Sequence, residues 1–304
     1  MQGPRRFYPE LALIAATIAY GSTFKLVQNA LEDVTPVGFI MLRFAVGAVV
    51  LIPFALRRGW RRPEVPNTSF NGFVRGVLLF GVVAFFGYWL QNLGLQRTST
   101  SNSAFITGLF VVFTPLVEMA VLHRAPPWNV RVAVVVSVVG LYLLEGQTLR
   151  LHSGDALTLG CAFLFGVWIF LGGQLSPRYN EVALTAGQLA VIFVLAVPIV
   201  VVSGLGQITS DVIVAVVFTG TVCSALAFSL QLWAQRWVEP SRAAVILLFE
   251  PVVAGFVGYA VGERLGAAGY AGAAVIFAGI LLAESRSWLR RIPDAQRSGA
   301  DAAT

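Results

Sequence analysis

Residues 182–203 read VALTAGQLAVIFVLAVPIVVVS, an apolar run that contains no charged residue. A helix rises about 1.5 Å per residue, so about 20 apolar residues cross a hydrocarbon layer of about 30 Å. In lipid the backbone polar groups must be satisfied within the segment itself, which favours a helix over an isolated strand. This run therefore predicts a membrane-spanning helix.

Runs of similar length and composition recur along the whole chain. The connections between them are short, so consecutive helices are expected to be antiparallel neighbours, and no loop is long enough to form a folded domain. The pattern predicts an all-α integral membrane protein with ten transmembrane helices, over residues 11–31, 35–56, 72–95, 101–122, 131–149, 154–173, 182–203, 211–233, 240–261 and 266–284.

Composition excludes the soluble classes. Only 12% of the 304 residues are charged, against about a quarter in typical globular domains, while 57% are hydrophobic and the mean hydropathy is +0.78. Cys161 and Cys223 lie inside apolar segments, and no metal-ligand spacing or nucleotide-binding loop is present. The sequence therefore predicts no cofactor and no metal, with the lipid bilayer and a small-molecule substrate as partners.

The net charge of +6 is explained by topology. If the N-terminus is cytoplasmic, sixteen of the 21 basic residues lie on the cytoplasmic side, three lie outside and two fall within spans. This asymmetry follows the positive-inside rule. We therefore expect an inner-membrane protein with both termini in the cytoplasm, and no nucleic-acid partner, because the basic residues form no stripe interleaved with aromatic residues.

The two halves of the sequence resemble each other in order. Five spans per half is an odd number, so the second half must enter the membrane from the opposite side, as in many secondary transporters. The expected units are residues 1–150, the inverted unit 151–285 and a polar cytoplasmic tail, 286–304. At an offset of 145 or slightly less, the matched pairs are Gly21 and Gly166, Arg43 and Gln188, Pro53 and Pro198, Gln91 and Gln231, Pro115 and Pro251, and Gly140 and Gly279.

Glu250 is the sharpest candidate for a binding residue, because ionisable groups at membrane depth are costly unless they face a cavity or a partner. It lies midway along the ninth span, in Phe249-Glu250-Pro251. Pro251 cannot donate to the carbonyl of Leu247 and bends the helix there. The carboxyl could bind an amine, a cation or a proton; the alternative is a protonated packing residue. Pro251 and its repeat mate Pro115 are the candidate hinge or gating residues.

Other polar and aromatic residues within the spans extend this site. Lys25 and Gln28 share a helix face, although Lys25, like Arg43, could instead reach the outer interface. Gln91 and Gln231 could bind polar substrate groups or join helices. Aromatic residues could cover the apolar part of a substrate or pack against neighbours. The candidate substrate-binding residues are Lys25, Gln28, Tyr88, Gln91, Asn102, Thr107, Trp168, Gln231 and Glu250.

Several short motifs are similar to those of the EamA-type drug/metabolite transporter superfamily. The resemblance covers about residues 10–284. In the first half it rests on Gly21-Ser22-Thr23-Phe24, Leu42-Arg43-Phe44 and residues 99–109, STSNSAFITGL. In the second half it rests on residues 231–236, Arg242-Ala243-Ala244, residues 249–252, FEPV, and Gly262-Glu263-Arg264-Leu265. The family's first-span lysine corresponds to Gln28 here, whereas Lys25 follows Phe24 directly.

The resemblance implies ten helices and a central cavity built from spans one, three, four, six, eight and nine. It also implies a secondary transporter that exports small amphipathic metabolites by alternating access. Amino acids, including aromatic ones, are the leading substrate class, as in YddG-like exporters, with protons as a candidate coupling ion. Rival interpretations are a nucleotide-sugar or other drug/metabolite exchanger and, from another class, an intramembrane enzyme or scaffold.

Overall fold

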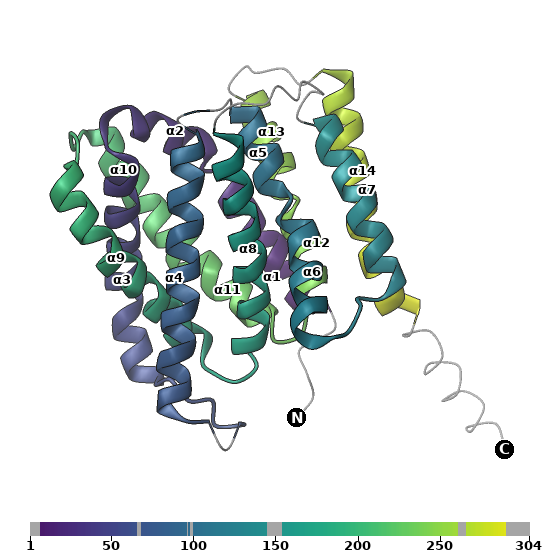
Figure 1. Ribbon diagram of the computed structural model, residues 1–304, viewed down its shortest axis with the longest axis horizontal. Coiled ribbons are helices and arrows are strands. Elements are labelled where there is room, and N and C mark those ends of the chain that lie inside the picture. The colour runs from purple at the N-terminus through teal and green to yellow at the C-terminus, as the bar shows by residue number, and fades with distance from the viewer. Residues whose placement is uncertain are drawn as a thin grey trace.

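The computed structural model describes residues 7–65, 68–95, 97, 100–144, 154–260 and 266–289 as a bundle of helices. Figure 1 shows them standing roughly side by side. In the first half the helices are α1 (Tyr8–Gly21), α2 (Phe24–Asp33), α3 (Pro36–Arg58), α4 (Phe70–Leu95), α5 (Thr100–Gly108), α6 (Phe110–Leu122) and α7 (Trp128–Leu144). In the second they are α8 (Asp155–Leu175), α9 (Glu181–Ser203), α10 (Ser210–Phe218), the π-helix η1 (Thr219–Ala227), α11 (Phe228–Ala234), α12 (Pro240–Leu247), α13 (Glu250–Ala260) and α14 (Ala267–Leu289).

The all-α membrane fold is confirmed. Among the described residues, eight helical stretches are long and apolar enough to cross a membrane. α7 is a shorter apolar helix at the expected fifth span, and α1 with α2 occupies the expected first span. Large apolar side chains such as Leu56, Val201 and Val202 are exposed on the outside of the bundle, as lipid-facing residues are. The count of ten spans stays a prediction, and residues 290–304 of the expected tail lie outside the described residues.

Three of the expected spans are each divided into two helices near the middle. α1 gives way to α2 at Ser22–Thr23, α5 to α6 at Leu109, and α12 to α13 at Leu248–Phe249. At each break a backbone N–H bonds to the carbonyl three residues earlier, for example Phe249 to Ile246 at 3.1 Å. The chain stays right-handed through Ser22, Leu109 and Leu248, so each break is a local tightening of the helix at membrane depth, where transporters bind their substrates.

The eighth span is interrupted differently, because its central nine residues form the π-helix η1. A π-helix has more residues in each turn than an α-helix and is found frequently at functional sites. Here it carries Cys223 and Ser224 inward, and both side chains are buried. The repeat mates of the first and eighth spans are more regular: α8, in the sixth span, and α4, in the third, are continuous helices, whereas the fourth and ninth spans, which are mates of each other, are both divided.

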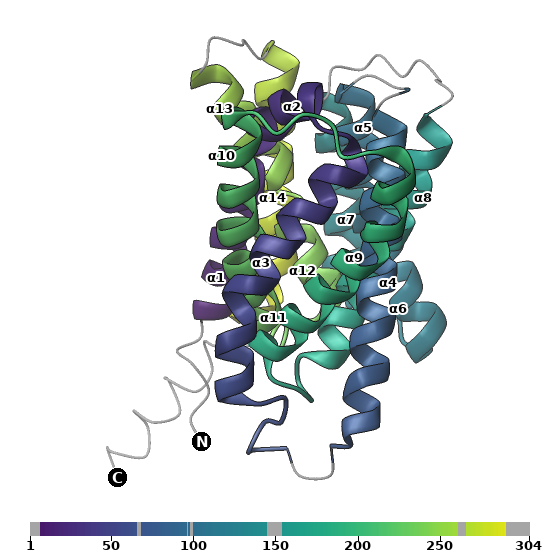
Figure 2. The same cartoon turned by 90° about the vertical axis from the view of Figure 1, so that its left-hand side faces the viewer.

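Two isolated β-bridges display the inverted repeat directly. Val34 pairs with Gly206, and Arg61 pairs with Tyr179. Adding 145 to Val34 and to Arg61 gives Tyr179 and Gly206, so the repeat operation converts one bridge into the other. In Figure 2 the connections that form the first bridge lie at the upper end of the bundle, and those of the second lie at the lower end. The two halves therefore cross the membrane in opposite directions.

Helix packing follows the same symmetry. α8 packs against α4 and α6 of the first half, and α1 packs against η1, α11 and α13 of the second. The glycines matched in the sequence lie at these contacts. A Cβ on Gly21 would lie 2.7 Å from the carbonyl O of Glu250, and one on Gly166 would lie 2.8 Å from Cβ of Phe113. Small residues at both positions let the helices approach closely.

Candidate functional site

Polar side chains meet in the interior of the bundle where α1, α3, α4, η1, α11 and α13 adjoin. Tyr20, the penultimate residue of α1, donates its hydroxyl proton to Oε1 of Gln231 at 2.9 Å. Gln231 lies on α11 and is only 1% exposed, and its Nε2 atom is buried without a partner among the described residues. A buried amide with an unused donor is costly unless water or a ligand satisfies it.

Arg43 of α3 enters the same region from the other side. Its Nε donates to Oγ of Ser224 in η1 at 2.9 Å. Its guanidinium carbon lies 5.3 Å from the ring centroid of Phe44 and 5.6 Å from that of Tyr88. These cation–π contacts and the hydrogen bond hold the guanidinium among the helices. Arg43 therefore does not extend along the lipid-facing surface, which was the alternative for this residue.

Glu250 is the first residue of α13, immediately after the break in the ninth span. The amino end of a helix carries partial positive charge, so this position favours a carboxylate. The backbone of Glu250 packs against Gly21, the residue that follows Tyr20 in α1. Glu250 and Arg43 form no ion pair with each other, and both side chains are half-buried in an apolar bundle.

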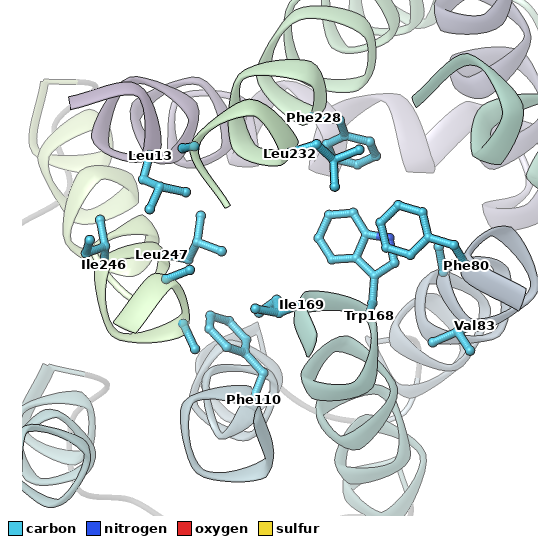
Figure 3. Packing of buried hydrophobic residues seen from close by; sticks show 14 of the residues in the cluster. Leu13, Phe80, Val83, Phe110, Trp168, Ile169, Phe228, Leu232, Ile246 and Leu247 are labelled. Atoms are coloured by element: carbon cyan, nitrogen blue, oxygen red, sulfur yellow. The ribbon is translucent and has the colours of Figure 1, made fainter. Parts of the chain in front are cut away.

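Aromatic rings line this polar cluster continuously. Tyr88 lies 5.2 Å from Phe44 and 5.0 Å from Phe165, and Phe228 lies 5.7 Å from Tyr20 and 5.2 Å from Trp168, all between ring centroids. Figure 3 shows Trp168 of α8 beside Phe80 of α4, with Phe228 and Leu232 of α11 nearby. The rings provide a broad apolar wall beside a small number of polar groups, which is typical of small-molecule sites.

The indole of Trp168 is fixed in place by a second buried amide. Trp168 stacks on Phe80 with an interplanar angle of 8° and donates through Nε1 to Oε1 of Gln188 at 2.9 Å. Gln188 is the repeat mate of Arg43 and is fully buried on α9. Its own Nε2 is buried without a partner among the described residues. The repeat thus places a cation on one side of the cluster and a neutral amide on the other.

The structure brings some of the predicted residues together and leaves others apart. Tyr88, Glu250, Gln231 and Trp168 belong to the cluster. Thr107 instead lies beside Cys161 of α8, and Gln91 is half-buried farther along α4. Three more are placed by backbone only: Lys25 and Gln28 on α2 and Asn102 on α5 have side chains outside the described part of the chain. Of the candidate hinges, Pro251 follows the break between α12 and α13, whereas Pro115 lies within α6.

Sequence reasoning omitted Arg43, Tyr20, Ser224 and Gln188 from the binding residues. The match of Arg43 with Gln188 was a usable signal, because two polar residues occupy equivalent depths in the two halves. Nothing in the sequence pointed to Ser224 as a residue of the site. A serine in a span is ordinary, and only the π-helix turns this one toward Arg43.

One end of the bundle carries a set of ion pairs between helices. Arg242, at the start of α12, pairs with Glu284 of α14 and lies 3.4 Å from Oε1 of Glu10 in α1. Arg236 pairs with Glu181 at the start of α9. Burial lowers the pKa of Arg236 to about 10, which leaves it charged at neutral pH. The basic loops, the start of α1 and the end of α14 therefore lie at the same end of the molecule.

The model of the EamA-like transporter family matches residues 8–145 and 152–284. The chain belongs to this family. An uncharacterized transporter of Archaeoglobus fulgidus is 31% identical over 287 residues, covering 94% of this chain and 88% of that protein. The uncharacterized transporter YoaV of Bacillus subtilis is 21% identical over 82% of this chain and 87% of its own length.

A solved crystal structure shares the fold of this chain. It superposes with a TM-score of 0.76 over 93% of this chain and 98% of that chain, at 16% sequence identity. The chain is thus a multi-pass membrane transporter built from two EamA units. The cluster around Arg43 and Glu250 lies between those units, because Arg43 and Tyr20 come from the first and Glu250 and Gln231 from the second.

Proposed function

We propose that this EamA protein is a secondary exporter of small amphipathic metabolites, with amino acids, including aromatic ones, as the main substrates. The observation that carries the proposal is the central cluster. It combines a carboxylate at a helix break, buried amides with unused donors and a continuous aromatic wall. An amino acid offers an ammonium group for Glu250 and an apolar side chain for the rings of Tyr88 and Trp168.

The proposed mechanism is alternating access around this cluster. The discontinuous helices of spans one, four and nine supply hinges at membrane depth, with Pro251 next to the break beside Glu250 and Pro115 within α6. Pro251 lacks the N–H that would continue the helix past Leu247, so bending there breaks no backbone hydrogen bond. The two EamA units would move relative to each other and expose the cluster first to one side, then to the other.

The proposed orientation puts the basic end of the molecule in the cytoplasm of a cell whose inner membrane holds the protein. Arg62, Arg236 and Arg242 make their contacts at that end. By the positive-inside rule, this end, and with it both termini, faces the cytoplasm. Export would then carry substrate from the end with Arg242 to the end with the Val34–Gly206 bridge.

The test is flux in proteoliposomes that contain the purified protein. Vesicles are loaded with each of the twenty amino acids in turn, and release is compared with that from protein-free vesicles. We expect faster release for a subset that is rich in apolar and aromatic side chains. A complete panel with no excess release would overturn the substrate assignment, while the family membership would stand.

Glu250 is also the proposed proton carrier if transport is coupled to a pH gradient. Glu250→Gln keeps the shape of the side chain but cannot release a proton. We expect this variant to lose the dependence of flux on a pH gradient while exchange of substrate across the membrane stays measurable. A variant that responds to the gradient as wild type does would reject this role for Glu250.

The other candidate substrates and the other candidate classes of protein, an enzyme or a scaffold, have less support. A nucleotide sugar or sugar phosphate needs several cations around its phosphates, whereas Arg43 is the one cation among the described side chains of the cluster. Relatives are named transporters, and we propose that this chain is likewise not an enzyme and not a scaffold. An enzymatic role would require turnover of a compound that the proteoliposomes release chemically changed.

A further inference from the structure

The guanidinium of Arg43 has N–H donors that form no hydrogen bond with the described residues. Its Nε is used by Ser224, while no carboxylate of the described residues forms an ion pair with it and the Nη atoms have no protein acceptor among them. A guanidinium presents five N–H groups in a planar fork that matches the two oxygens of a carboxylate. Charge of this kind at membrane depth calls for a counter-ion.

The surroundings select the kind of anion. Phe44 and Tyr88 lie on one side of the guanidinium, because their ring centroids are only 5.2 Å from each other and 5.3 and 5.6 Å from its carbon, so an incoming anion reaches it from the side away from the rings. Ser224 is fully buried and accepts the hydrogen bond from Nε of Arg43. This bond orients the guanidinium and leaves its two Nη groups available for an anion. One guanidinium carries a single positive charge and can donate two parallel hydrogen bonds to one carboxylate. A phosphate dianion would keep one negative charge without a partner. The subsite therefore fits a carboxylate.

Glu250 supplies the complementary half. The backbone of Glu250 packs against Gly21 at the end of α1, and Cys223, the neighbour of Ser224, donates to the carbonyl O of Ala19 in the same turn. Arg43, bonded to Ser224 of η1, and Glu250 of α13 therefore approach the same turn of α1, and they form no ion pair with each other. A free α-amino acid carries a carboxylate and an ammonium on one carbon and would neutralise both groups at once. An amine or a carboxylic acid would leave one charge of the pair unmatched in an apolar bundle, at a large cost.

We infer that Arg43, oriented by Ser224 of the π-helix, binds the carboxylate of the substrate while Glu250 binds its ammonium, which restricts transport to zwitterions with both groups free. This inference rests on the proposed function and deepens it. Ser224 acts here as a positioning residue, since it touches Arg43 and not the substrate.

The experiment compares three compounds with one side chain: phenylalanine, phenethylamine, which lacks the carboxylate, and 3-phenylpropionate, which lacks the amine. Release from wild-type proteoliposomes is measured at pH 7, and leucine, 3-methylbutylamine and 4-methylpentanoate form a parallel series. We expect release of the amino acid to exceed that of either analogue by at least about tenfold, because each analogue leaves one of the two half-buried charges unpaired inside the bundle.

Variants of Arg43 then test whether this residue binds the carboxylate of the substrate. Arg43→Gln should lower amino-acid release at least about tenfold and abolish the preference over phenethylamine, while Arg43→Lys, which keeps the charge but loses the fork, should fall between. Ser224→Ala should raise the KM for the amino acid more than it lowers kcat. The matched control is Arg75→Gln on the exposed part of α4, which should behave as wild type.

The outcomes separate the two proposals. If wild type releases neither amino acid, the proposed function and this inference fall together. If it releases an amino acid and its amine analogue equally well, or if Arg43→Gln retains the preference, the inference is wrong while amino-acid export stands. The wild-type comparison needs no variant and decides the restriction to zwitterions. If Arg43→Gln fails to fold, Arg43→Lys, which keeps the charge, tests the assignment of the carboxylate to Arg43.

Discussion

The contact between α7 and α14 allows a sharp test of how closely these helices pack. Gly272 of α14 faces Leu144 and Gly140 of α7, and a Cβ built on Gly272 would lie 2.3 Å from the backbone N of Leu144 and 2.5 Å from the carbonyl O of Gly140. Both atoms belong to the backbone and cannot rotate away. Gly272→Ala must therefore push the helices apart by at least about 0.7 Å to reach 3.0 Å.

Gly279→Ala is the matched control. It lies on the same helix and in the same interface, and it gains the same helix propensity, about 1 kcal/mol over glycine. Its Cβ would meet Oγ of Ser137 at 2.4 Å, but the nearest backbone atom, the carbonyl O of Ala133, is 3.3 Å away. The serine hydroxyl can turn aside, so this substitution should be tolerated.

The difference between the two variants isolates the backbone clash. Overpacking that forces the backbone to move costs about 1–3 kcal/mol, so Gly272→Ala should be less stable than Gly279→Ala by about that amount. Thermal unfolding in detergent, followed by circular dichroism, should show a lower Tm, by about 2–4 °C for each kcal/mol if soluble domains are a guide. A Tm for Gly272→Ala equal to or above that of Gly279→Ala would refute the packing described for this pair.

Three further substitutions test other parts of the bundle by the same unfolding measurement. Arg242→Gln removes the guanidinium that pairs with Glu284 and lies 3.4 Å from Glu10, and it should cost about 3 kcal/mol, which an unchanged Tm would contradict. Asn180→Ala removes the side chain that accepts from two backbone N–H groups at the start of α9 and should cost about 1 kcal/mol, whereas Asn180→Ser should retain most of the stability. Phe228→Ala empties a fully packed position between Tyr20 and Trp168 and should cost about 3–5 kcal/mol; a loss below about 1 kcal/mol would mean that the rings collapse into the space.

The fold could be predicted from the sequence because a bilayer imposes simple requirements. A run such as 182–203 has few structures open to it in lipid, and the short loops leave few topologies. The offset that matched Pro53 with Pro198 also relates the two β-bridges, so the repeat is present at the level of backbone contacts. The break at Pro251 was predictable as well, since proline removes a helical donor.

The interruptions without proline were not predictable. Ser22 and Thr23 are compatible with a continuous helix, and their break depends on packing, where Gly21 meets the backbone of α13. The π-helix likewise depends on its surroundings and not on a residue type. The sequence indicated how deep in the membrane Arg43 lies, but not whether its side chain points into the bundle or toward lipid. Its inward orientation depends on the hydrogen bond to Ser224, and the π-helix determines the position of Ser224.

The bonds at the ends of α3 and α9 have a mechanical consequence. Thr35, which caps the start of α3, donates to the carbonyl O of Gly204 just after α9, at 3.0 Å. Asn180, which caps the start of α9, donates through its backbone N to the carbonyl O of Trp60 just after α3, at 3.1 Å. Each helix is thus fastened to the other at both membrane surfaces.

A rearrangement that opens either face cannot proceed by separating these two helices. We expect α3 and α9 to stay in contact and to form the axis about which the two EamA units rotate. A covalent cross-link between α3 and α9 should then leave substrate flux intact, whereas a cross-link between α1 and α13 should arrest it. Equal loss of flux in the two cases would show that α3 and α9 must separate during transport.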